Sequence, residues 1–129
     1  MRDFQVYLED IIDAINSIEE YTRGLSFDAF VEDRRTVDAV VRNFEIIGEA
    51  TKHIPERIRR DYPKVPWKDM AGMRDKLIHG YFGVQLDVVW KTVKNRLPIV
   101  RPLVEEALAK MKEETARYSR LTNSKNRLC

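Results

Sequence analysis

Apolar residues recur every three or four positions along most of this chain, and this spacing constrains the fold more than any other feature. In the first segment they are Phe4, Leu8, Ile11, Ile15 and Ile18. Side chains with this spacing lie on one face of an α-helix, whereas a half-buried strand needs strict alternation, which is nearly absent here. The pattern predicts an amphipathic first helix that ends near Gly24.

The same spacing predicts a short and then a long helix in the next segment. Ser26 can cap a short turn that runs through Phe30. The long helix is expected over residues 33–54, and Pro55 ends it because proline has no backbone N–H. Gly48 lies inside this helix, where glycine costs roughly 1 kcal/mol relative to alanine. It therefore indicates a place where another backbone packs closely.

Proline and glycine divide the middle of the chain. Residues 55–66 contain three prolines and form a connector, with one helical turn expected around Ile58. Pro66 can stand at the start of a third helix, which we place over residues 67–79 and which Gly80 would end.

A fourth helix is expected to start at Leu86 or Asp87. Pro98 and Pro102 leave two alternatives for the C-terminal part of the chain: one helix that kinks, or a new helix from Pro98 to about Tyr118.

These elements predict an all-α protein, an antiparallel helical bundle of four to five main helices. Residues 1–118 are expected to form a single domain. Residues 119–129 contain Arg120, Lys125 and Arg127 among small polar residues and are expected to be a disordered basic tail.

Composition narrows the classes of protein. A chain of 129 residues can bury a core without a metal or disulfide, and its net charge of +2 does not require a nucleic-acid partner. The single cysteine, Cys129, suits a reducing compartment. Acidic residues in the first segment argue against a signal peptide, and no run approaches the ~18 apolar residues of a membrane span. We expect a cytoplasmic protein without membrane association.

Chemistry concentrates in residues 72–84, where Arg74, Asp75 and His79 occur together. On the expected helix, Asp75 and His79 are four residues apart and share a face, so the carboxylate could orient the imidazole. His79 would lie in the last turn, where the helix dipole favours a protonated ring. These groups suit RNA cleavage without a metal: histidine moves protons and a guanidinium stabilises charge on the phosphate. The spacing alone also fits a structural network of ion pairs at a helix end.

A family resemblance favours the catalytic interpretation. The segment from Arg74 to Tyr81 resembles the Arg-x4-His-x-Tyr motif of HepT-like toxins in the HEPN superfamily. Flanking segments occur in the order expected for the family. Residues 42–50 resemble its second helix, residues 65–67 and 70–73 resemble its approach to the motif, and residues 87–90 with Leu97-Pro98 resemble its following helix. The resemblance covers roughly residues 3–110.

The resemblance implies several properties. Family members are helical homodimers whose two motifs face a shared cleft, and they act as toxic ribonucleases encoded beside a minimal nucleotidyltransferase antitoxin. In related pairs the antitoxin transfers AMP to the motif tyrosine, which here is Tyr81. AMP would add bulk and negative charge two residues from His79 and should repel an RNA phosphate.

Other residues offer weaker candidates. A basic cluster beside Tyr62 could contact RNA or be a solvated connector; it consists of Arg57, Arg59, Arg60 and Lys64. Of these, Arg57, Arg60 and Lys64 are the candidate RNA contacts, together with Lys76 of the motif. His53 is expected to be a solvated residue at a helix end. The two histidines are too far apart in the sequence for a recognisable metal site, so we expect neither metal nor cofactor. Trp67 and Trp90 are expected in the core or at a dimer interface.

The sequence is also compatible with a protein that is not an enzyme. The chain could be a non-catalytic helical dimer that binds a nucleotidyltransferase partner or a nucleotide.

Overall fold

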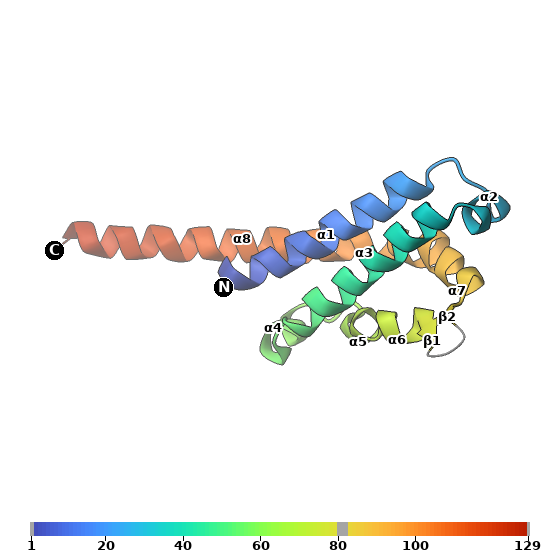
Figure 1. The fold of residues 1–129 in the computed structure, drawn as a ribbon. Helices are drawn as coiled ribbons and strands as arrows, with labels where there is room; N and C mark the ends of the chain where they lie inside the picture. Colours follow the sequence, from blue (N-terminus) through green and yellow to red (C-terminus); the bar gives the residue numbers. More distant parts are fainter. Residues whose placement is uncertain (1, 80–82, 129) are drawn as a thin grey trace.

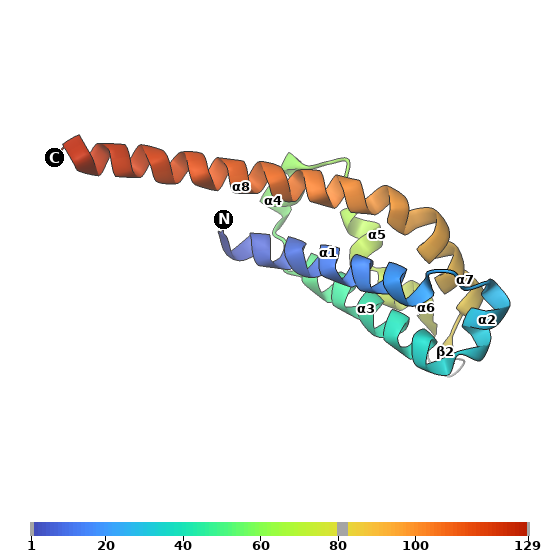
Figure 2. The ribbon, with the colours of Figure 1, turned by 90° about the horizontal axis from the view of Figure 1, so that it is seen from above.

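Three long helices form the body of the protein. The computed structural model describes the backbone of residues 2–79 and 83–128 and the side chains of residues 4–75 and 85–122. The long helices are α1 (Arg2–Thr22), α3 (Arg34–Lys52) and α8 (Leu97–Leu128). α1 packs against both of the others and runs antiparallel to them (Figure 1 and Figure 2). The all-α antiparallel bundle predicted from the sequence is confirmed.

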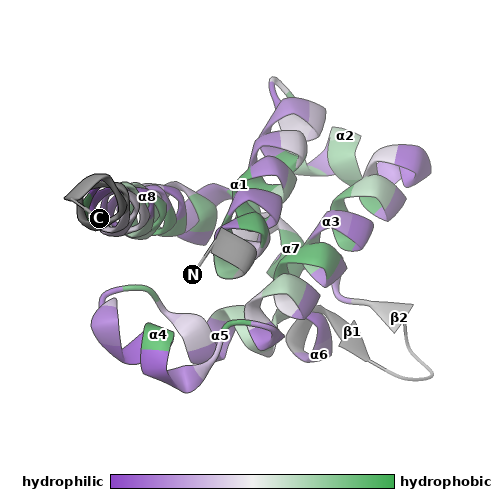
Figure 3. Cartoon of the chain, turned by 90° about the vertical axis from the view of Figure 1, so that its left-hand side faces the viewer, coloured by the Kyte–Doolittle hydropathy of each residue, from purple (hydrophilic) through white to green (hydrophobic). Residues whose placement is uncertain are grey.

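The apolar stripes of these helices meet in one core. Viewed from the end, the hydrophobic faces of the helices turn toward one another and the hydrophilic faces turn outward (Figure 3). The largest fully buried side chains come from all parts of the bundle: Leu8, Ile11, Ile15, Ile18, Phe30, Phe44, Ile47, Ile54, Ile58, Met70 and Leu97. The three-or-four spacing of the sequence therefore identifies the buried faces.

Turns and caps at the first corner follow the expected chemistry. Gly24 has φ +78°, the left-handed conformation that glycine adopts without strain, just after α1 ends. The Ser26 hydroxyl accepts a hydrogen bond from the Ala29 N–H and caps α2 (Phe27–Glu32). The Asp33 carboxylate accepts from the N–H and the hydroxyl of Thr36 and caps α3. The predicted boundaries here are confirmed.

The connector between α3 and the motif is fixed by side-chain donors. It contains α4 (Glu56–Asp61), the helical turn expected around Ile58, and leads into α5 (Trp67–Ala71). The Arg59 guanidinium donates to the carbonyl oxygens of Thr51 and Ile54, both at 2.9 Å, and satisfies the last turn of α3. The Trp67 indole N–H donates to the carbonyl oxygens of Arg59 and Tyr62 at 3.2 and 3.0 Å.

The third helix differs from the expectation. The structure has no continuous helix over residues 67–79: α5 stops at Gly72, α6 covers Met73–Leu77, and Ile78–His79 form the strand β1. β1 pairs antiparallel with β2 (Gly83–Val84), so that His79 lies opposite Gly83. The N–H of Gly72 turns back to the carbonyls of Lys68 and Met70 and closes α5. β-branched residues at 78 and 84 favour the extended pairing, which helical periodicity alone does not reveal.

A wide helical turn joins α7 (Leu86–Lys91) to α8. The π-helical segment η2 (Thr92–Arg96) lies between them, and the N–H of Leu97 donates to the carbonyl of Thr92, five residues back. Pro98 explains this geometry: it has no N–H for the carbonyl four residues earlier, and its ring would crowd that carbonyl in a normal turn. Of the two alternatives, the structure is closer to a new helix, which begins at Leu97.

The C-terminal segment also differs from the expectation. α8 continues to Leu128 and projects past the start of α1 (Figure 1), where a disordered tail was expected after Tyr118. No glycine or proline follows Pro102 in the sequence, and arginine, lysine and leucine favour helix, so a helix already formed can continue. Among the described helices, none combines the length and apolar character needed to cross a membrane.

Candidate active site

Arg74 and Asp75 are presented by a segment whose backbone lies directly on α3. A Cβ atom added at Gly48 would lie 3.5 Å from the carbonyl oxygens of Met70 and Ala71, and 3.9 Å from the backbone nitrogen of Arg74. The close approach predicted from Gly48 is confirmed. Met70 and Met73 are buried on the inner side of this segment, whereas Arg74 and Asp75 are exposed. Buried methionines and the glycine contact thus fix the backbone from which both charged side chains extend.

His79 does not continue this helix. α6 ends at Leu77, so the expected shared helical face of Asp75 and His79 is wrong, and so is the expected position of His79 in a last helical turn. The backbone of His79 instead belongs to the β1–β2 hairpin. The side chains of His79 and Lys76 and all of Tyr81 lie outside the described residues. The motif is therefore divided between a helix that carries Arg74 and a strand that carries His79.

A groove of about 230 Å³ lies beside Met73, the residue that precedes Arg74 in the chain. Its lining comes from α5, α6, α7, η2 and α8: Pro66, Asp69, Met70, Met73, Val88, Thr92, Arg96, Ile99 and Val100. Asp69 and Arg96 approach each other to 4.0 Å at its polar part, and Ile99 is 59% exposed. Sequence reasoning missed this groove, because its walls come from segments that only the tertiary fold brings together.

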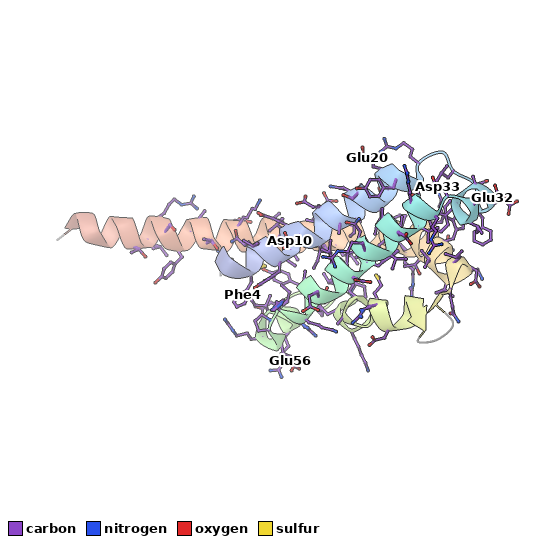
Figure 4. All side chains as sticks on the ribbon, in the orientation of Figure 1. Phe4, Asp10, Glu20, Glu32, Asp33 and Glu56 are labelled. Carbon is purple, nitrogen blue, oxygen red and sulfur yellow. The ribbon has the colours of Figure 1, made fainter. Side chains whose placement is uncertain are left out.

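The basic cluster lies apart from Arg74. α4 and α6 are at opposite ends of the α5 segment (Figure 1 and Figure 3). Arg57 lies 5.6 Å above the ring of Phe4, and Arg60 pairs with Glu56 at 3.5 Å; Phe4 and Glu56 are labelled at this end of the molecule in Figure 4. Lys64 and Lys110 both flank Glu106, where the hydrogen bond and charge of Lys110 chiefly lower the pKa of the Glu106 carboxyl. Within one chain, the structure does not bring the cluster to the motif.

The remaining candidates have structural surroundings. His53 stacks on Tyr7 with ring centroids 4.8 Å apart and lies 3.8 Å from Glu49. Trp67 is buried in the core, and Trp90 packs on Phe30 with centroids 5.0 Å apart. In the part of the chain that the structure describes, no three His, Cys, Asp or Glu side chains gather in a group that could hold a metal ion.

Comparison with known proteins identifies the family of the chain. A family model described as "Ribonuclease HepT-like" matches residues 11–107, a range that includes both Arg74 and His79. A protein of Thermococcus cleftensis named "Probable ribonuclease HepT" is 51% identical over 105 residues, which cover 81% of this chain and 96% of the relative.

Two further relatives are each named "Putative RNase". One, from Methanocaldococcus jannaschii, is 41% identical over 113 residues, covering 88% of this chain and 93% of the relative. The other, from Caldanaerobacter subterraneus subsp. tengcongensis, is 45% identical over 112 residues, covering 87% of this chain and all of the relative. No significant match was found among solved structures.

Proposed function

Because the chain belongs to the Ribonuclease HepT-like family, we propose that it is a metal-independent endoribonuclease whose catalytic residues are Arg74 and His79. The observation that carries the proposal is the presentation of Arg74: its side chain is exposed, while its backbone is held against α3 at Gly48. A catalytic cation needs such fixed support, because stabilisation of a transition state depends on preorganised charge.

The proposed reaction is attack by the RNA's own 2′-hydroxyl. His79 accepts the proton of that hydroxyl, the 2′-oxygen forms a bond to phosphorus, and the bond to the 5′-oxygen breaks. The leaving oxygen takes up a proton, which gives a 2′,3′-cyclic phosphate and a 5′-hydroxyl end. Arg74 stabilises the negative charge that grows on the phosphate oxygens. Asp75 is the proposed orienting residue for His79, now across the end of α6 rather than along one helical face.

Two-fold association would complete this site. The groove beside Met73 is mostly apolar and includes the exposed Ile99, which is surface that a second copy could cover. A C2 homodimer formed through this region would bring the Arg74 and His79 of both protomers to one cleft. Arg57, Arg60, Lys64 and Lys76 are the proposed additional RNA contacts.

A nucleotidyltransferase antitoxin is the proposed partner, in a type VII-like toxin–antitoxin system. The support is the Tyr81 that follows His79 in the Arg-x4-His-x-Tyr motif. Transfer of AMP would form a phosphodiester between the Tyr81 oxygen and the α-phosphate of ATP, with pyrophosphate as the leaving group. The added negative charge would then oppose binding of RNA.

A nuclease assay on purified protein tests the catalytic proposal. Wild type should cut RNA in the presence of EDTA and leave cyclic phosphate ends, while Arg74→Ala and His79→Ala should lose at least about 100-fold in rate. His53→Ala is the matched control, because His53 stacks on Tyr7 instead of serving the motif. Equal cleavage by wild type and His79→Ala, or none by wild type, would favour the non-catalytic binding dimer.

Intact-mass measurement tests the partner proposal. Co-expression with the nucleotidyltransferase encoded beside this gene should add AMP mass to the wild-type chain, and Tyr81→Phe should block the addition while cleavage persists. Tyr118→Phe is the matched control, because Tyr118 is an exposed tyrosine far along α8. Full modification of Tyr81→Phe would show that the assignment is wrong.

A further inference from the structure

The last part of α8 leaves the bundle. Near the N-terminal end of α1, Gln5 ties α8 to the body: its Nε2 donates to the carbonyl of Met111 at 3.3 Å and to the hydroxyl of Thr115 at 2.8 Å. From residue 116 to residue 122 every side chain is exposed. We define residues 116–128 as the arm; at 1.5 Å per residue it extends about 20 Å beyond the body. Figure 1 and Figure 2 show it projecting away from the end that carries the β1–β2 hairpin.

The arm carries the positive charge of the protein. Four of the 23 Lys and Arg residues lie after Thr115, and none of the 21 Asp and Glu residues does. Residues 1–115 therefore hold 19 basic and 21 acidic side chains, a net charge of −2, and the arm brings the whole chain to +2. A nuclease body with net negative charge repels RNA at long range, and a separate basic element can reverse this.

The arm also lies beyond the region that the family model matches. That region ends at residue 107, and the arm begins at residue 116. The matched region already contains the motif, so the arm is an addition to the part of the fold that carries the proposed catalytic residues.

We propose that the arm is an RNA-binding element that contacts backbone phosphates without regard to base sequence. The inference deepens the proposed ribonuclease function and depends on it for RNA as the ligand. Arg117 and Arg120 are three residues apart and share a face of the helix, and both are exposed. Arg117 pairs with Glu113 at 3.3 Å, but an exposed pair of this kind is weak and a phosphate can displace the carboxylate.

The composition of the arm favours RNA over a protein partner. A helix that docks on another helix presents a continuous apolar stripe. Among the described arm residues only Tyr118 and Leu121 are large and apolar, at 73% and 59% exposure, and arginine, serine and threonine stand between and around them. Tyr118 offers in addition a ring on which an unpaired base can stack.

The position of the arm predicts which kinetic constant it affects. Because the arm points away from the hairpin that carries His79, it would hold RNA at a distance from the bond being cut. Loss of its charge should raise KM for long RNA and leave kcat unchanged, since the interaction is the same in the ground and transition states.

Binding of an RNA single strand of about 20 nucleotides with 2′-O-methyl groups tests the proposal by fluorescence anisotropy. This probe cannot be cleaved by 2′-hydroxyl attack, so binding is measured whether or not the catalytic proposal holds. Single-stranded sites lose about 0.7 in the slope of log K against log salt for each phosphate contact removed. Arg117→Gln with Arg120→Gln should thus lower the slope by about 1.4 and the affinity at about 0.1 M salt by about 25-fold.

Matched controls make the outcome decisive. Arg34→Gln with Arg35→Gln removes the same charge from exposed positions at the start of α3 and should leave the slope unchanged. A variant that also replaces Lys125 and Arg127 with glutamine should lower the slope further. If the arm variants bind the probe like wild type, or lower affinity no more than the α3 control does, the proposal is overturned. Arm variants that bind the RNA probe like wild type but no longer dimerise, or no longer bind the antitoxin, would overturn the proposal in favour of a protein-docking role.

Discussion

Gly48 is the position where packing of the core and placement of the candidate site meet, and it gives the sharpest mutational prediction. We compare Gly48→Ala with Gly48→Val. Both substitutions add a Cβ on the face of α3 that touches the Met70–Arg74 backbone, but only valine adds branches beyond it. The pair thus separates an effect on the helix from an effect on the distance between α3 and the motif segment.

The structure sets the expected magnitudes. The alanine Cβ would lie 3.5 Å from the carbonyl oxygens of Met70 and Ala71, which is ordinary van der Waals contact. Because alanine is better than glycine inside a helix, Gly48→Ala should stabilise the fold by up to about 1 kcal/mol. Valine places γ-carbons a further bond of about 1.5 Å outward, and its χ1 is stiff in helices, so at least one branch meets this backbone. Overpacking of this kind costs about 1–3 kcal/mol.

The assays are urea unfolding and RNA cleavage. Gly48→Ala should keep full activity with an unchanged or higher unfolding midpoint. Gly48→Val should lower the midpoint and also lose activity, since α5 and α6 must move outward and carry Arg74 with them. As a control, Gly24→Ala should destabilise the fold through the positive φ at the turn after α1, and the variant should stay active because this turn carries none of the motif residues. A Gly48→Val protein as stable and active as wild type would refute the reasoning.

The helix caps, the connector and the metal-free chemistry each give one more prediction. Asp33→Ala should lower the melting temperature at neutral pH by a few degrees, because the hydrogen bonds from Thr36 cap α3 and lower the pKa of the Asp33 carboxyl. That stabilisation is present above the unfolded pKa of about 3.9 and is lost as pH falls through the lower folded pKa. The melting temperatures of wild type and variant should therefore converge in acid, and a difference that persists after the carboxyl is protonated would contradict this role. Trp67→Phe should cost about 1–2 kcal/mol in urea unfolding, since it leaves the carbonyls of Arg59 and Tyr62 without their indole donor; an unchanged midpoint would contradict this role. Removal of divalent metal by EDTA should leave RNA cleavage at its full rate, and activity that returns only with added Mg²⁺ would rule out the proposed mechanism.

Much of the fold could be predicted from the sequence, because its signals are local. Apolar spacing identified the buried faces of the long helices, and Gly24, Ser26, Asp33 and Pro55 marked their ends through their own backbone and side-chain chemistry. The order of residues around Arg74 and His79 likewise identified the family, since a motif is a property of the chain itself.

Only the tertiary structure decided how the motif segment is shaped. The spacing of Asp75 and His79 fits one helical face, yet the chain leaves the helix at Leu77 because pairing of residues 78–79 with 83–84 competes with one more helical turn. This pairing joins residues on two sides of a turn, and the spacing of apolar residues along a helix does not predict it. The same holds for the groove beside Met73, whose walls meet only after α5, α7 and α8 have packed. Sequence determined the buried faces of the long helices and the order of the motif residues, and packing determined which of these residues come together.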